Sequence, residues 1–374
     1  MKLIGIDIGN DSIKIKAKDN EINIMNLISA GYNRRVFGQE MGHLSNLLDV
    51  SIESKGKDLG RYFIGGLAFK ENRGDMIEKS RGETKAESDT TYIMILASLA
   101  YALYDENNPV KKEYVTLGAG LPTEEYFNDR LLDLFKSRLK GTHKVTFHSP
   151  NFKGAQITII IDRVEVIPEG TSAALSILYD DKGRFKEKYE HLRDKLILII
   201  DIGSLTVDVS TMENGTFIGK GFFGINKGIA DPLNSILLDL KNSYGYETSR
   251  HKLDYYLRRY GFIEFSGNKI SLTEMAERHF EDFTRVMANQ IYKELDMHGL
   301  NINDVHTAFI VGGGAITLKN YLDKYLHFSR LEFAENPLMA NAEGYLKSIS
   351  FIAASGEEEK KEVFEEEVAI SKQE

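Results

Sequence analysis

The sequence contains one short motif twice: Ile6-Asp7-Ile8-Gly9-Asn10-Asp11-Ser12 near its start and Ile200-Asp201-Ile202-Gly203-Ser204-Leu205-Thr206 near its middle. In each copy an apolar run ends at an aspartate, and a glycine-containing turn leads into a second apolar run. This pattern predicts two β-hairpins, with strands at 3–8 and 13–17 and at 196–202 and 206–210. A single repeat at so large a spacing indicates two related halves and not a solenoid.

The residues at these turns are suited to holding phosphate and a hydrated cation. Turn glycines let backbone N–H groups point into one concavity, and a carboxylate at a strand end can hold Mg²⁺, mostly through water. For one copy alone an ordinary charged hairpin explains the motif equally well, whereas two copies could grip one polyphosphate from opposite sides. The predicted ligands are Asp7, Gly9, Asn10, Asp11, Ser12 and Lys14 from the first hairpin, and Asp201, Gly203, Ser204, Leu205 and Thr206 from the second.

Two further glycine segments extend the candidate site. A predicted strand at 309–311 runs into Gly312, Gly313 and Gly314, whose backbone can approach a flat or charged ligand. Lys227 and Gly228 follow a predicted strand at 222–225 and begin either a helix that approaches the ligand or a loop. Glycines after strands also form plain turns, so these two segments support a ligand-binding site only in combination with the two hairpins.

Composition excludes several other kinds of protein. The chain has 374 residues and a net charge of −9, which argues against a broad surface for binding nucleic acid directly. It has no cysteine, so disulfides, thiolate metal sites and cysteine nucleophiles are excluded. Its apolar runs have strand length, far short of the ~20 residues of a membrane helix, and its start does not resemble a signal peptide. We therefore expect a cytoplasmic protein with no membrane contact.

Strands and helices are predicted to alternate, which indicates the α/β class. Besides the hairpins, the expected helices cover 88–104, 124–139, about 168–179 and 272–298, the last starting at a capping box on Ser271. The expected strands cover 114–118, 144–147 and 155–166. The segment at about 30–87 is expected to be irregular or a small insertion.

The two hairpins, the segment Pro168-Glu169-Gly170 and the strand ending in three glycines together resemble the actin, Hsp70 and sugar-kinase superfamily. This resemblance implies a two-lobed, actin-like ATPase fold made of duplicated ribonuclease-H-like halves, with the nucleotide in the cleft between the lobes. Within the superfamily the chain is most similar to ParM-type bacterial actins. The segments that carry this likeness are Leu117-Gly118-Ala119-Gly120-Leu121-Pro122 and Tyr62-Phe63-Ile64-Gly65-Gly66-Leu67-Ala68.

The resemblance also implies roles for individual residues. Glu169 matches the glutamate that positions or deprotonates the attacking water. Asp7 and Asp201 match the aspartates that hold hydrated Mg²⁺ and help to orient that water, which makes Asp201 a catalytic residue as well. An acidic residue favoured in the first turn of a helix is the alternative for Glu169. The implied nucleotide is ATP, with GTP as an alternative. Two departures are Asn10, where relatives carry Ser or Thr, and Ser204-Leu205, which places a bulky side chain beside the second turn.

The predicted domains follow from the same likeness. Lobe I comprises residues 1–168 and about 335–355, with the insertion at about 30–87. Lobe II comprises residues 169–334, with an insertion at about 235–275. Connecting helices are expected near Glu169 and over 340–345, where small residues allow close helix crossing. The Glu-rich tail, residues 356–374, is expected to be disordered.

The leading functional hypothesis is a ParM-like filament that segregates plasmid DNA by ATP-dependent polymerisation and by disassembly after hydrolysis. Its partners would be other copies of itself and a ParR-type DNA-binding adaptor, because the acidic chain is not expected to bind DNA itself. The alternatives are a non-polymerising ATPase or small-molecule kinase of the same superfamily, and a phage or cell-organising bacterial actin.

Overall fold

The chain forms two compact units. The computed structural model describes residues 1–71 and 83–354. Unit 1 contains Met1–Lys186 together with the residues from Met339 onward, and unit 2 is Glu187–Leu338. The first boundary thus follows Lys186, whereas the sequence placed it after residue 168. The predicted acidic tail, residues 356–374, and residues 72–82 of the predicted insertion lie outside the described residues.

A mixed sheet of nine strands, counted over the described residues, forms the centre of unit 1. Its order is β3-β2-β1-β7-β9-β8-β5-β6-β4. The strands are β1 (Lys2–Ile8), β2 (Ser12–Ala17), β3 (Asn20–Met25), β4 (Ile28–Ala30), β5 (Leu48–Ser54), β6 (Lys57–Ile64), β7 (Val110–Leu121), β8 (Gly141–Phe147) and β9 (Gln156–Pro168). Because β1, β7 and β9 are parallel neighbours, their carboxyl ends meet at one edge of the sheet.

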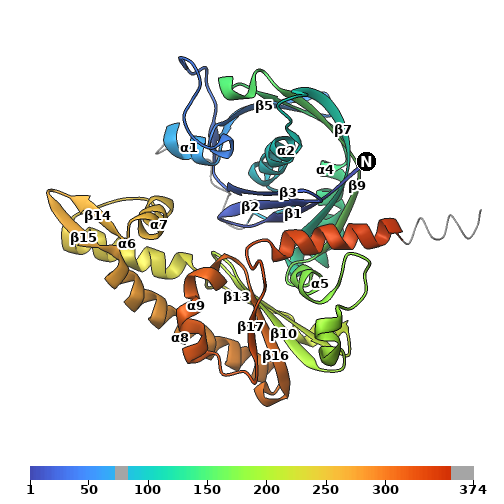
Figure 1. The fold of residues 1–374 in the computed structure, drawn as a ribbon, viewed down its shortest axis with the longest axis vertical. Helices are drawn as coiled ribbons and strands as arrows, with labels where there is room; N and C mark the ends of the chain where they lie inside the picture. The colour runs from blue at the N-terminus through green and yellow to red at the C-terminus, as the bar shows by residue number, and fades with distance from the viewer. Residues whose placement is uncertain (72–82, 355–374) are drawn as a thin grey trace, which may run out of the picture. The chain divides into compact units, whose positions relative to one another are not determined.

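The sheet curls around helix α2 (Asp89–Leu103), as Figure 1 shows. Residues on nearly every side of α2 are apolar and buried, among them Met94, Leu96 and Leu99. Ser88 begins the helix, since its hydroxyl accepts a hydrogen bond from the backbone N–H of Thr91. The predicted helix at 88–104 is therefore confirmed, and it forms the core of unit 1.

The segment predicted as one helix over 124–139 forms two helices. α3 (Thr123–Tyr126) ends early, and the side chain of Asn128 accepts the N–H of Leu131 to cap α4 (Asp129–Leu139). The single-helix prediction is wrong, because the apolar spacing continues across a break that the capping asparagine creates. Phe127 lies at this break and is 75% exposed.

The segment at about 30–87, expected to be irregular or a small insertion, contributes regular structure to the main sheet. β5 pairs with both β6 and β8, and β6 pairs with β4. The short helix α1 (Gly66–Glu71) follows β6, and η1 (Leu44–Asn46) precedes β5. The buried alternation along β5 explains its place in the sheet, since Val50 and Ile52 face the core.

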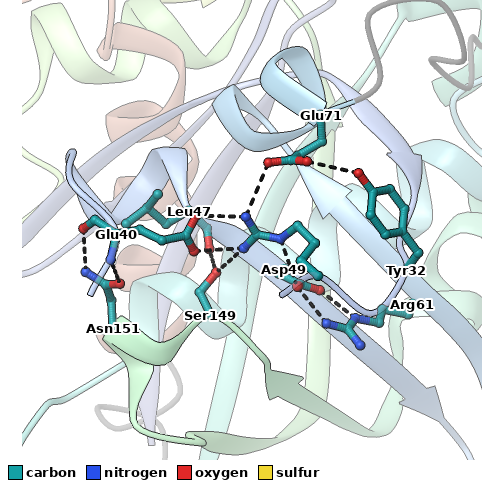
Figure 2. A network of polar contacts seen from close by, with 9 residues as sticks. Tyr32, Glu40, Leu47, Asp49, Arg61, Glu71, Ser149 and Asn151 are labelled. Atoms are coloured by element: carbon teal, nitrogen blue, oxygen red, sulfur yellow. Dashed lines mark hydrogen bonds and ion pairs between the residues drawn. The ribbon is translucent and has the colours of Figure 1, made fainter. Parts of the chain in front are cut away.

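A buried polar network holds residues 31–47 of this segment in place (Figure 2). Arg34 donates two hydrogen bonds to the carboxylate of Glu40, at 2.7 and 2.8 Å. Asn151 binds the backbone of Glu40 through both its amide oxygen and its amide nitrogen. Asp49 accepts two hydrogen bonds from Arg61, each of 2.7 Å. These contacts fix the course of a stretch that has little regular secondary structure.

The helix at 340–354 packs backbone to backbone against other elements of unit 1. A Cβ added to Gly5 on β1 would overlap the carbonyl oxygen of Ala342. A Cβ added to Gly344 would overlap the carbonyl oxygen of Ser172, the first residue of α5 (Ser172–Leu178). The helix predicted at 340–345 is confirmed, and its small residues permit the close crossing that the sequence suggested.

Unit 2 contains a second, smaller mixed sheet in the order β12-β11-β10-β16-β17, with β13 paired to β11. The strands are β10 (Leu196–Ile202), β11 (Val207–Glu213), β12 (Thr216–Phe217), β13 (Phe223–Ile225), β16 (Val305–Val311) and β17 (Leu331–Phe333). β10 is antiparallel to β11 and parallel to β16. The arrangement repeats that of β1, which is antiparallel to β2 and parallel to β7.

The helices of unit 2 are α6 (Ala230–Tyr244), α7 (Arg250–Arg259), α8 (Leu272–Met297) and α9 (Gly313–Tyr325), as far as the structure describes the unit. α8 confirms Ser271 as the N-cap of the predicted helix, because the hydroxyl of Ser271 accepts the N–H of Glu274. The predicted insertion at about 235–275 covers most of α6, α7 and the hairpin β14 (Phe262–Phe265) and β15 (Asn268–Ser271).

Candidate functional site

The two predicted hairpins have the same register. Ile8 pairs with Ile13 in the first and Ile202 with Val207 in the second, so each turn has four residues. Each aspartate belongs to the residue pair next to the one that closes the turn: Asp7 lies opposite Lys14, and Asp201 lies opposite Asp208. The sequence repeat is therefore a repeat of backbone structure, although the side chain opposite the aspartate differs in charge.

The turn glycines meet the same steric limit in both hairpins. A Cβ on Gly9 would stand 2.8 Å from the carbonyl oxygen of Ser12, and one on Gly203 would stand 2.9 Å from that of Thr206. In the second turn the N–H of Gly203 also donates to the carbonyl of Thr206, at 2.9 Å. Both turns are thus compact loops that a side chain at the glycine would force open.

The first turn is fixed by its neighbours in unit 1. Lys14 forms an ion pair of 2.9 Å with the carboxylate of Asp7, which is 8% exposed. Asn26 donates from its side chain to the carbonyl of Gly9 and from its backbone to the carbonyl of Asp11. The turn therefore presents a charged pair at the carboxyl end of β1, where the sequence predicted Asp7 and Lys14 as separate ligands.

Glu169 lies in a turn after β9 and not in a helix. Pro168 is the last residue of β9, the N–H of Glu169 donates to the carbonyl of Leu121, and Gly170 has a φ of 87°. The prediction of a helix that opens at Pro168-Glu169 is wrong. Proline fits the start of a helix but also the end of a strand, and the glycine turns the chain here. Since β9 and β1 are parallel, Glu169 still lies at the same sheet edge as Asp7.

Lys85, which lies outside every predicted motif, joins these elements. Its ammonium group donates to Glu169 Oε1 at 2.5 Å and to the carbonyl of Ile8 at 2.8 Å. The carboxylate of Glu125 accepts the backbone N–H groups of Lys85 and Ala86, at 2.9 and 3.1 Å. No local motif marks Lys85, because its role depends on strands more than 75 residues away in both directions.

The surroundings of Lys85 favour its charged form. Burial alone lowers the pKa of the amine, but the charge of Glu169 and the hydrogen bond to it act in the opposite direction. The charges of Asp7 and Glu125 add to this effect, so the pKa of Lys85 is raised above its ordinary value. The unit 1 site thus contains an ammonium group held among three carboxylates.

In unit 2 the start of α6 packs on the second turn. The N–H groups of Ile229 and Ala230 donate to the carbonyls of Gly203 and Ser204, at 3.2 and 2.9 Å. A Cβ on Gly228 would overlap the carbonyl oxygen of Ser204. The sequence predicted either a helix start or a loop at Lys227 and Gly228. These residues form the short segment that precedes α6 and bring the start of that helix against the turn.

The glycine segment after β16 lies beside Asp201. Gly312 has a φ of 85° and is the N-cap of α9, so that Gly313 and Gly314 belong to the first turn of that helix. A Cβ on Gly312 would overlap Asp201 Oδ1 and would stand 2.5 Å from the carbonyl oxygen of Ile202. Because β16 is the parallel neighbour of β10, the strand ends bring Gly312 and Asp201 together.

The second turn also contains a polar atom suited to a ligand. The hydroxyl oxygen of Ser204 is buried, and among the described residues it has no hydrogen-bond partner. Leaving such a group unpaired costs roughly 1–3 kcal/mol, which a ligand oxygen would recover. Leu205, the bulky residue that departs from the pattern of the relatives, is 46% exposed and so does not fill the interior of the turn. Thr206 donates to Asp208 at 2.8 Å.

The predicted site residues therefore form two groups, one in each unit. The group in unit 1 contains Asp7, Gly9, Asn10, Asp11, Ser12, Lys14 and Glu169; the group in unit 2 contains Asp201, Gly203, Ser204, Leu205, Thr206, Lys227, Gly228, Gly312, Gly313 and Gly314. Over residues 1–71 and 83–354, no three His, Asp or Glu side chains gather in a way that could hold a metal ion. In the same part of the chain no helix has the length and hydrophobicity needed to cross a membrane.

Comparison with known families matches both halves of the chain. The family described as the N-terminal domain of actin like proteins matches residues 5–171, which include Asp7 and Glu169. The family described as the C-terminal part of the archaeal actin homologue MreB-like matches residues 199–324, which include Asp201 and Gly312. No curated protein sequence matches the chain.

Solved structures with the same fold cover almost the whole chain. Alp7A, an actin-like protein, is 17% identical, with 98% of this chain and 99% of that chain covered and a TM-score of 0.75. A ParM from a 15-stranded filament of Clostridium botulinum is 20% identical, with 92% and 98% covered and a TM-score of 0.73. Ta0583, an archaeal actin homologue in complex with ADP, is 18% identical, with 93% and 99% covered and a TM-score of 0.70. The chain has the two-lobed actin-like fold, and each of its halves is similar to a family of actin-like proteins.

Proposed function

We propose that this chain is a filament-forming ATPase of the ParM kind, which polymerises with Mg·ATP and disassembles after hydrolysis. The observation that carries the proposal is the repeated turn, in which Gly9 and Gly203 close four-residue loops of the same register beside Asp7 and Asp201. Support for nucleotide binding comes from Ta0583 with ADP, and support for self-assembly comes from the ParM filament, since both have this fold.

The residues present suit a magnesium nucleotide. Asp7 and Asp201 would hold the hydrated ion, and the backbones of the two turns would bind phosphate oxygens. The unpaired hydroxyl of Ser204 offers a hydrogen bond to a ligand oxygen in unit 2, and the close packing at Gly228 and Gly312 holds the second turn and Asp201 in place. When bound, Mg²⁺ neutralises phosphate charge, which is most of what phosphoryl transfer requires from its surroundings. Glu169 would orient the attacking water.

The proposed cargo is plasmid DNA, bound through a ParR-type adaptor. A net charge of −9 opposes direct binding, because contact with DNA phosphates needs clustered Lys and Arg. The adaptor would therefore supply the basic surface, while this chain supplies the polymer. Purified filaments mixed with plasmid DNA at ~0.15 M salt should leave the DNA in the supernatant. Pelleting of DNA with the filaments alone would contradict the need for an adaptor.

Assembly itself is tested by light scattering and pelleting of the purified chain. We expect scattering to rise after addition of Mg·ATP and to fall as phosphate is released, with little assembly in ADP or after chelation of Mg²⁺. Parallel reactions with GTP determine the nucleotide preference. Asp201→Ala should reduce turnover and the Mg²⁺ dependence together. No assembly with either nucleotide at any protein or salt concentration would refute the filament proposal.

A further inference from the structure

On the basis of the proposed function, we infer that Lys85 is a positioning residue for hydrolysis, which holds the Glu169 carboxylate at the end of β1. Nothing in the local sequence assigns Lys85 a role, and it reaches the site from a segment outside both hairpins. Its ammonium group bonds Glu169 at 2.5 Å and the carbonyl of Ile8 at 2.8 Å. One side chain thus connects the ends of β1 and β9, which lie on either side of β7.

The lysine is held firmly enough to position another group. Glu125, itself 9% exposed, accepts both backbone N–H groups at residues 85 and 86. The side chain of Lys85 is only 11% exposed, so water screens its charge weakly. An ammonium group that is fixed at its backbone and bonded at its tip to the carbonyl of Ile8 gives Glu169 a defined place relative to the first turn.

Glu169 needs such a partner because its own backbone gives little orientation. It lies between the last residue of β9 and Gly170, whose φ of 87° marks a tight turn. The side chain is 23% exposed and has several rotatable bonds, so the bond to Lys85 restricts the directions that its carboxylate can take. A glutamate that orients water must keep one direction, since misplacement by about 1 Å can cost ~10²-fold in rate.

The alternative is a purely structural ion pair, which would stabilise the fold without affecting hydrolysis. The two roles differ in what a substitution changes. Lys85→Met removes the charge and keeps the length of the side chain, whereas Lys85→Arg keeps the charge. Lys55→Met is the matched control, because Lys55 also donates to a carbonyl, that of Ser137, but lies on the turn between β5 and β6.

The first measurement is steady-state hydrolysis by the full chain at saturating Mg·ATP, beside the affinity for a fluorescent ATP analogue. For Lys85→Met we expect kcat to fall by about 100-fold while the dissociation constant changes by less than about threefold. Lys85→Arg should recover part of kcat, and Lys55→Met should match the wild type. Unchanged kcat in Lys85→Met, or equal losses of binding and kcat, would overturn the inference.

The second measurement is the pH profile of kcat. Lys85 is the cation bonded to Glu169, and the other charged groups at this edge are Asp7, which Lys14 neutralises, and Glu125. Removal of the cation should raise the pKa of Glu169, so the acid limb of kcat should move to higher pH by about one unit. A purely structural pair would leave this limb in place.

A third measurement separates this inference from the proposed function, because it needs no nucleotide. Thermal unfolding of Lys85→Met, Glu169→Gln and the double variant forms a cycle. We expect each single variant to lower Tm by several degrees and the double variant to lose less than the sum. Additive losses would show that the pair does not form. Coupling in this cycle, together with no hydrolysis by the wild type, would instead refute the proposed ATPase and with it the role of Lys85.

Discussion

Gly312 lies so close to Asp201 that the glycine has no room for a side chain beside the Oδ1 atom of the carboxylate. The two residues end neighbouring parallel strands, β16 and β10, and Gly312 also begins α9. The carboxylate and the start of the helix are thereby brought to one place in unit 2. Gly312 also has a positive φ of 85°, which residues other than glycine rarely adopt.

Gly312→Ala should therefore destabilise unit 2 and displace Asp201. The backbone conformation, with a φ of 85° and a ψ of 169°, costs alanine roughly 1–3 kcal/mol, and overlap with the carboxylate adds roughly 1–3 kcal/mol. Chemical denaturation measures the loss, and nucleotide affinity should fall with it. Gly219→Ala serves as a control, because a Cβ there meets nothing within 4 Å and Gly219 does not have a positive φ. Equal stability of the two variants would contradict the close approach of Gly312 to Asp201.

Gly344→Ala should destabilise unit 1 although alanine favours helix. Propensity alone predicts a gain of about 1 kcal/mol in a helix interior. Overlap with the carbonyl oxygen of Ser172 opposes it, and relief requires that α5 move away from the helix at 340–354, at a cost of roughly 1–3 kcal/mol or more. Thermal unfolding should show a lower Tm. A higher Tm would mean that the helices are not in backbone contact.

Arg34→Met should cost roughly 3–5 kcal/mol, because it leaves the carboxylate of Glu40 without its cation in a poorly hydrated place (Figure 2). The hydrogen bonds from Arg34 are also what lower the pKa of Glu40. Urea unfolding measures the loss. Phe37→Ser is the control, because Phe37 lies in the same segment and is 94% exposed. This substitution should change the free energy of unfolding by less than about 0.5 kcal/mol.

Stability should fall as the pH drops below about 6.5, in part because of His143. Burial lowers the pKa of this imidazole in the folded state, so the unfolded chain takes up a proton first. Its contribution is therefore fully present above the unfolded pKa of ~6.5 and is lost as pH falls toward the folded pKa. The ring fits its neutral form, because Nε2 donates to the carbonyl of Leu139 and Nδ1 accepts from Ser54. His143→Gln should flatten the pH dependence of Tm between pH 7 and 5; an unchanged slope would contradict this.

Glu169→Gln should slow hydrolysis by about 100-fold or more and leave nucleotide-dependent assembly in place, so that filaments persist. Simultaneous records of phosphate release and light scattering separate the two effects. Glu165→Gln is the control, because Glu165 lies on β9 and forms an ion pair with Arg163, whose side chain is 51% exposed. Loss of assembly in Glu169→Gln to the same degree as hydrolysis would show that Glu169 has another role.

The sequence predicted the hairpins well because their signal is local and occurs twice. Alternating apolar residues, a terminal aspartate and a turn glycine all lie within a few positions, and the second copy confirmed the first. The segments around Pro168 and Phe127 were predicted wrongly because their local patterns fit two structures. At Pro168 the choice is made by the contact of Glu169 with Leu121, which is distant in sequence. At Phe127 it is made by the cap that Asn128 forms on α4.

The charge partner of Glu169 could not be predicted from one sequence. Lys85 is one of many lysines, and only the parallel order of β1, β7 and β9 brings Ile8 and Glu169 within its reach. The place of β5 and β6 in the main sheet was missed similarly, since β5 pairs with β8 across about 90 residues. Pairing between distant strands leaves no mark in the spacing of either one.

Because the chain returns to unit 1 at Met339, the two units cannot be expressed separately in the same way. Unit 2 is one continuous stretch, Glu187–Leu338, and a single gene fragment can encode it. Unit 1 is discontinuous, and its late helix at 340–354 packs against Gly5 on the very first strand. A fragment truncated after Lys186 would expose this glycine-lined surface of the sheet, so expression of unit 1 alone calls for a linker that replaces unit 2.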